Sequence, residues 1–126
     1  MTKAAALQEF WAGFGLEAYE ENTIPTGDDS PAMPYITYSA ATDSFSGGGV
    51  MLSASLWYRS TSWVQINAKA EEISAAIGMG GKVIRCDGGF IWLRRGTPFA
   101  QNMGDPDDDT IRRKYINIEA EFLTMN

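Results

Sequence analysis

The sequence predicts an α+β fold: a mostly antiparallel sheet of about five to six strands with a leading amphipathic helix and one crossing helix. Three observations predict it. Apolar residues recur at helical spacing in two segments, they alternate at strand spacing in several others, and a tight-turn signal separates two short strand-like segments. The chain has 126 residues, 44% of them hydrophobic, so we expect one domain over residues 1–126 with a single core.

Both predicted helices carry an apolar stripe and end at glycine. In the first helix, the stripe at i, i+3, i+4 and i+7 consists of Leu7, Phe10, Trp11 and Phe14. Gly13 and Gly15, on either side of Phe14, supply the stop signal. The second helix opens with a predicted capping box, Ser62-x-x-Gln65, and ends at Gly78. Its stripe is Ile66, Ala70, Ile73 and Ile77. Both stripes are expected to pack on the sheet.

The remaining periodic segments predict strands. They cover residues 16–22, 35–39, 50–59, 82–86, 90–95 and 115–122. Asp87-Gly88-Gly89 lies between the fourth and fifth of these and favours a hairpin turn. The last strand alternates most clearly, with Ile116, Ile118, Ala120 and Phe122 predicted to face inward. Flexible loops are expected near residues 23–34, 40–49 and 96–110, which are rich in glycine, proline and acidic residues.

Composition excludes several classes of function. The chain has no histidine, so catalysis by Ser-His-Asp or Cys-His groups is excluded and the commonest zinc sites are absent. Its single cysteine, Cys86, rules out an internal disulfide framework. We expect a protein that is not an enzyme and takes no cofactor or metal. No apolar run approaches membrane-spanning length and no signal peptide is recognisable, so a soluble protein is expected.

Charge is unevenly distributed along the chain. The net charge is −6. Up to Tyr58 there is one basic residue, Lys3, against seven acidic residues, whereas nine basic and nine acidic residues follow. An acidic front half and a locally basic back half can meet head to tail in an assembly. The alternative is an ordinary solvated acidic surface. Neither interpretation indicates binding to a nucleic-acid backbone, which requires a net basic face.

The candidate functional residues are therefore interface residues. Trp57 faces away from the inward set of its strand, and arginine pairs suit carboxylates either on a neighbouring subunit or in the acidic segment beginning at Asp105. That segment is interpreted as a solvated loop, a docking loop or, least favoured, a metal site, because it lacks the spacing of a calcium loop. The predicted contacts to another subunit or to a docking partner are Trp57, Arg94, Arg95, Asp107, Asp108, Asp109, Arg112 and Arg113.

The order of the elements resembles a known family. A leading helix precedes a strand containing Pro34-Tyr35-Ile36-Thr37-Tyr38, then comes the segment Tyr58 to Ile77, the CDGG hairpin and the terminal strand RKYINIEAEF. These features resemble the tail terminator (tail completion) proteins of long-tailed bacteriophages, and the resemblance extends roughly from Leu7 to Thr124.

The resemblance implies a structural virion protein and no catalysed reaction. Subunits of this family close into a homohexameric ring that caps the tail tube, ends its polymerisation and provides the surface for head attachment. The implied partners are further copies of the chain, the tail tube protein and the head–tail connector proteins. DNA would only pass through the lumen, and no membrane is involved. The implied location is the neck end of the virion tail, after assembly in the host cytoplasm.

Two alternatives remain open. The chain resembles the family in features that other phage neck or tail components share, so a head–tail connector, a stopper or a tail tube subunit is the first alternative. A small metal-dependent enzyme that uses Asp105 and Asp107 to Asp109 is the second, from a different class of protein.

Overall fold

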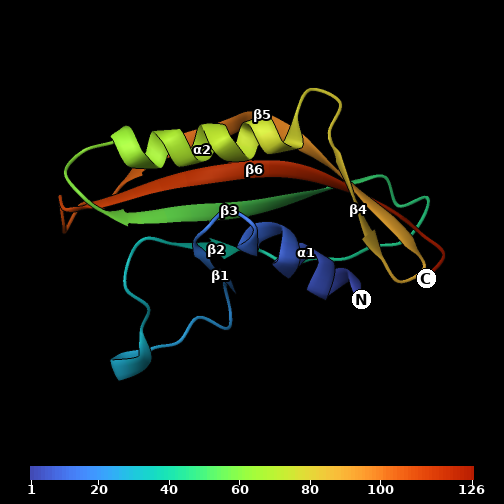
Figure 1. Cartoon of the computed structure of the whole chain (residues 1–126), viewed down its shortest axis with the longest axis horizontal. Helices are drawn as coiled ribbons and strands as arrows, with labels where there is room; N and C mark the ends of the chain where they lie inside the picture. The colour runs from blue at the N-terminus through green and yellow to red at the C-terminus, as the bar shows by residue number, and fades with distance from the viewer.

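The computed structural model describes all 126 residues and has the predicted α+β architecture (Figure 1). Two helices and one 3-10 turn accompany six strands. In chain order the elements are α1 (Lys3–Ala12), β1 (Glu17–Glu20), η1 (Gly27–Asp29), β2 (Tyr35–Tyr38), β3 (Gly49–Arg59), α2 (Val64–Ile77), β4 (Lys82–Cys86), β5 (Gly89–Gly104) and β6 (Ile111–Thr124). The leading helix and the crossing helix are therefore both present where the sequence predicts them.

The six strands form one sheet in the order β1-β2-β3-β6-β5-β4. Only β1 and β2 run parallel, and the other four pairings are antiparallel, which confirms the mostly antiparallel prediction. The terminal strand β6 lies in the middle, between β3 and β5. β4 and β5 form the predicted hairpin, closed by the pair Cys86 and Gly89, and Gly88 takes a positive φ of 83° in its turn.

Both helices cover the same face of the sheet. α2 packs on β3, β5 and β6, while α1 contacts β1 and β4, the two edge strands. Because one helix touches both edges, the sheet curls around it (Figure 1). All 22 buried apolar residues form one cluster between the helices and this face. The cluster includes both predicted helix stripes and the inward residues of β6, because alternation along a strand sends every second side chain to the covered face.

The ends of α2 differ partly from the prediction. The capping box is wrong: the Ser62 hydroxyl accepts a hydrogen bond from the Val64 N–H at 3.1 Å, and Trp63, not Ser62, occupies the N-cap position. The helix begins one residue later than the motif requires, so Gln65 is not at the helix position from which a capping box bonds back to the N-cap residue. Gly78 ends the helix as predicted, with a φ of 75°.

The loop predicted at residues 96–110 is shorter in the structure. β5 continues to Gly104 through a register shift between Arg95 and Ala100, and only residues 105–110 connect it to β6. Glycine and proline at 96–98 indicated the end of a strand, but β6 is long enough to pair with β5 on both sides of the irregularity. The Asn117 side chain donates to the Pro98 carbonyl at 3.0 Å across the shift.

The other two predicted loops lack long regular elements. Residues 23–34 contain only the short η1, and the segment from 40 to 48 has no helix or strand before β3 begins at Gly49. Neither α1 nor α2 has the length and hydrophobicity needed to cross a bilayer.

Candidate functional site: the open face of the sheet

The face of the sheet that no helix covers carries a row of aromatic side chains. We call it the open face. Tyr19 on β1 meets Tyr35 on β2 edge to face, with ring centroids 6.3 Å apart and planes at 81°. Tyr35 then stacks against Trp57 on β3 at 6.3 Å and 25°. Aromatic rings in neighbouring strands interact favourably in both geometries. The row therefore continues across three strands on a surface without a helix.

Arg113 extends this row onto β6. It lies directly across from Trp57 in the β3–β6 register, and its guanidinium carbon is 4.7 Å from the Trp57 ring centroid and 5.8 Å from that of Tyr115. Its Nε donates to the Ser55 hydroxyl at 3.1 Å. No carboxylate lies within ion-pair distance of Arg113. The guanidinium is thus held in place by aromatic faces and a hydroxyl and forms no ion pair, although Glu21 lines the same groove.

The indole of Trp57 is also fixed through its polar end. Its Nε1 donates to the Thr37 hydroxyl at 2.9 Å, so the ring cannot turn without losing a hydrogen bond. A groove of about 410 Å³ lies over this part of the face. Its lining includes Tyr35, Thr37, Trp57, Arg113 and Tyr115. The burial that these neighbours provide raises the pKa of the Tyr35 hydroxyl, against a smaller opposing effect of Arg59.

This arrangement suits recognition of a carboxylate presented by another molecule. A guanidinium stacked on aromatic rings keeps its remaining N–H donors oriented in one plane, which matches a carboxylate with two parallel hydrogen bonds. Across the whole chain, no group of three or more acidic or cysteine side chains is placed to hold a metal ion. The open face offers a binding surface.

At the other end of the open face, the arginine is already paired with carboxylates of the same chain. Arg94 on β5 lies 4.2 Å over the Trp92 ring and forms ion pairs with Glu119 and with Glu121, the second at 3.9 Å. Its charge is satisfied within the chain. Arg94 and Arg113 therefore share the open face but differ in whether a partner carboxylate is already present.

The remaining predicted arginines point to the helix-covered side. Arg95 donates to the Ser74 hydroxyl on α2 at 3.0 Å. Arg112 donates to the backbone carbonyls of Asp109 and Thr61 at 2.7 and 2.8 Å, and it lies 5.2 Å over the Trp63 ring. Adjacent residues in a strand face opposite sides, so each predicted arginine pair is divided between the two faces.

The acidic segment lies at one end of the sheet, in the turn from β5 to β6. Asp108 accepts hydrogen bonds from the Thr110 hydroxyl at 2.6 Å and the Thr110 N–H at 2.8 Å, and it forms an ion pair with Arg59 at 3.4 Å. These interactions, led by the Thr110 hydroxyl, lower the pKa of Asp108. Asp107 and Asp109 are exposed and take part in no ion pair.

Sequence reasoning found Trp57 and Arg113 but missed their neighbours. Tyr19, Tyr35, Thr37, Ser55 and Tyr115 belong to the same surface. Alternation along each strand is visible in the sequence and indicates that each of these residues faces away from the core. The sequence does not reveal that β2 pairs with β3 and β3 with β6. These pairings place the residues of this surface side by side.

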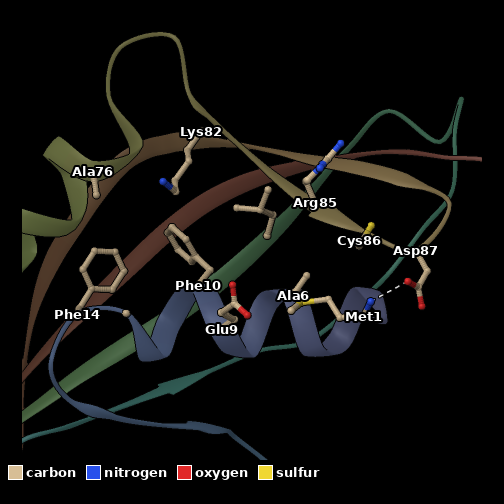
Figure 2. A pocket seen from close by; sticks show the side chains of 12 residues that line it. Met1, Ala6, Glu9, Phe10, Phe14, Ala76, Lys82, Arg85, Cys86 and Asp87 are labelled. Carbon is tan, nitrogen blue, oxygen red and sulfur yellow. Dashed lines mark hydrogen bonds and ion pairs between the residues drawn. The ribbon is translucent and has the colours of Figure 1, made fainter.

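A second hollow lies on the other side of the molecule, between α1 and β4. It has a volume of about 690 Å³, and Figure 2 shows the side chains around it. Phe10, Phe14 and Ala6 come from α1 and the turn after it, while Ile84 and Cys86 come from β4. Cys86 is half-buried here with a free thiol.

Comparison with known proteins gives a fold and no family. No family model matches the sequence, and no curated protein is similar enough to match it. Among solved structures, a chain from the "Virion of native gene transfer agent (GTA) particle" has the same fold with a TM-score of 0.59. The two chains are 19% identical, and the match covers 94% of this chain and 92% of the other. At this identity the likeness shows a common fold.

Proposed function

We propose that this chain is a structural virion protein that forms a ring on the end of a phage-type tail tube, ends polymerisation of the tube and provides the surface for head attachment. The observation that carries the proposal is the fold, which is shared over nearly the full length of both chains with a component of a virion particle. The resemblance of the sequence to tail terminator proteins supports the finer role, including a homohexameric ring that lets DNA pass through its lumen.

The open face supports an assembly role on physical grounds. A sheet with a second apolar face needs a second cover, and no helix of this chain lies over Trp57 and Tyr35, where only Glu21 and Ile24 from the β1–β2 connection reach the groove. Arg113 forms no ion pair within the chain, which favours a partner with a carboxylate at the same place. We assign this surface to contacts with a neighbouring subunit or with the tail tube. Asp107 and Asp109 are the exposed carboxylates at the end of the sheet and are proposed to take part in the same assembly.

The experiment combines two measurements on the purified full chain. Light scattering with negative-stain imaging determines whether the chain forms rings, alone or on purified tail tubes. A growth assay then adds the protein to polymerising tube subunits. We expect rings that bind one end of the tube and stop its elongation. A chain that stays monomeric at high concentration and also leaves tubes unbound and growing would contradict the proposal.

The same assay separates the alternative roles. A tube subunit would lengthen existing tubes, whereas a connector or stopper would leave tube growth unchanged and bind the head side. The fold likeness to a virion component is compatible with each of these roles, so the response of the tube decides between them.

A further inference from the structure

The segment of residues 23–34, which we call the acidic arm, stands away from the body of the protein. It connects β1 to β2, and its η1 turn lies well apart from the sheet in Figure 1. Asp28 and Asp29 are adjacent in η1, and both are exposed and free of ion pairs. The whole connection, residues 21–34, has the length that two parallel neighbouring strands require. The arm thus presents two unpaired carboxylates at its tip.

The arm is stiffer than a glycine-rich loop of the same length. Pro25, Pro31 and Pro34 fix φ at three positions, which lowers the conformational entropy lost when the arm is held by a partner. Proline nitrogens donate no hydrogen bond, so the carbonyls of the arm exceed its N–H donors. Half a dozen extended residues reach about 20 Å, which is enough to bridge into a neighbouring molecule.

The opposite edge of the sheet has complementary chemistry. The groove between α1 and β4, which we call the edge groove, has an apolar floor, and Lys82 on β4 points toward it (Figure 2). Arg85 points away from α1 and lies 5.7 Å over the Phe90 ring, so it flanks the same strand edge from the other face of the sheet. Neither cation forms an ion pair within the chain. Of the two acidic residues at the groove, Glu9 lies on the α1 side and Asp87 is paired with the amino terminus at 2.7 Å. The β4 side therefore remains positive.

β4 also offers unpaired backbone groups along this groove. It is the last strand of the sheet and pairs only with β5. Because Cys86 and Gly89 close a two-residue hairpin, alternate residues of β4 bond to β5, and the N–H and carbonyl groups of Val83 and Arg85 point outward. The next outward N–H, that of Asp87, already donates to the Met1 carbonyl at 2.7 Å. The amino-terminal residue of the same chain therefore occupies one end of this edge.

We propose that the acidic arm of one copy docks in the edge groove of the next copy. The arm then lies along the β4 edge, where its carbonyls accept from the outward N–H groups. One of the adjacent carboxylates of Asp28 and Asp29 pairs with Lys82 on the groove side, and the other pairs with Arg85 on the opposite face. The inference rests on the proposed ring-forming function and names its subunit contact. The arm leaves the molecule at the lower left of Figure 1, whereas β4 lies at the right. Contact between two different surfaces at opposite ends is head to tail, the kind of contact that closes into rings.

Paired charge reversals test this contact. Variant one carries Asp28→Lys and Asp29→Lys in the arm, and variant two carries Lys82→Glu and Arg85→Glu on β4. Each variant alone places like charges at every contact, so we expect its subunit dissociation constant to rise at least about tenfold. An equimolar mixture restores opposite charges at every contact if the two variants alternate around the ring. We therefore expect rings in the mixture and none with either variant alone.

The control variant has the same change of net charge as variant one, but the substituted residues lie outside the proposed contact. Glu71→Lys with Glu72→Lys on the exposed side of α2 changes the net charge as much as variant one, and we expect this control to form rings like wild type. Circular dichroism melting verifies that each variant is folded. Measurements are made by light scattering, both free and on purified tubes.

The outcomes separate the inference from the function. If wild type forms rings and the reversed variants form them equally well, or if the mixture fails to restore rings, the arm contact is overturned and the ring function stands. If the variants lose tube binding but keep their rings, the arm contacts the tube and the inference is likewise overturned. If wild type stays monomeric both alone and on tubes, the inference and the function fail together.

Discussion

The two faces of the sheet differ in burial and in the kind of contact that holds their side chains in place. Between the helix-covered face and its helices, 22 apolar residues are buried in one cluster. The open face carries half-exposed aromatic rings that are tied to one another by stacking, by Arg113 and by hydroxyl groups. The first arrangement stabilises the subunit through burial. The second holds an ordered surface that is only partly removed from water, which is what a contact with another molecule requires.

The largest effect on folding is expected from the centre of the covered face. Ile118 on β6 is completely buried, so Ile118→Ala should lower the free energy of unfolding by about 3 kcal/mol through lost burial and a residual cavity. Met51→Ala on the open face removes a comparable apolar side chain that is 56% exposed and should change stability by less than about 0.5 kcal/mol. Urea denaturation measures both. Equal losses would contradict the distinction between the two faces.

Adjacent arginines on β6 provide a sharper comparison. Arg112 holds two backbone carbonyls on the covered side, so Arg112→Glu should lower the free energy of unfolding by about 2 kcal/mol and leave ring contacts of the folded fraction intact. Arg113→Glu should cost about 1 kcal/mol or less in stability but abolish assembly or tube docking. Thermal melting and light scattering on both variants check this. Arg113→Glu with unchanged assembly would remove the open face from the proposal.

Two tryptophans test the same contrast with one residue type. Trp57→Ala should lower the free energy of unfolding by about 1–2 kcal/mol, because a half-exposed ring and its bond to Thr37 are lost, and should weaken assembly or docking at least tenfold. Trp63→Ala is the matched control, since Trp63 is also half-buried but packs against the core beside Arg112. We expect it to weaken folding alone. If Trp63→Ala impairs assembly equally, the loss reflects general destabilisation.

The smallest effect concerns the turn between β5 and β6. Thr110→Val removes the hydroxyl that contributes most to lowering the pKa of Asp108, so that pKa should rise toward 3.8. A depressed carboxyl pKa in the folded state stabilises the protein above its unfolded pKa, and this stabilisation disappears as the pH falls through the folded value. The difference in stability between the variant and wild type should therefore vanish in acid. NMR titration of Asp108 measures the shift, and an unchanged pKa would refute this cause.

Local pattern predicted most of the architecture. Alternation in residues 115–122 indicated which side chains of β6 are buried, and the stripes of both helices did the same, because the period of a helix or strand is a local property. The two predictions that the structure contradicts, the start of α2 and the end of β5, were also based on local sequence signals. The Ser62 motif indicated a capping box that starts one residue too early, and Gly96 and Pro98 indicated a loop where the length of β6 keeps β5 paired.

The sequence predicted some residues of the candidate site but not which of them are neighbours, because that depends on the pairing of strands that are distant in the sequence. From the sequence alone, Trp57 and Arg113 were identified as outward side chains of two separate strands, and Arg112 was grouped with Arg113. The alternation of a strand separates Arg112 from Arg113 as soon as residues 111–124 form one strand. The tertiary structure alone placed Trp57 across from Arg113 and Tyr35 beside Trp57. It also set the acidic arm and the basic edge groove at opposite ends, because the free energy that selects strand order comes from burial summed over the whole core.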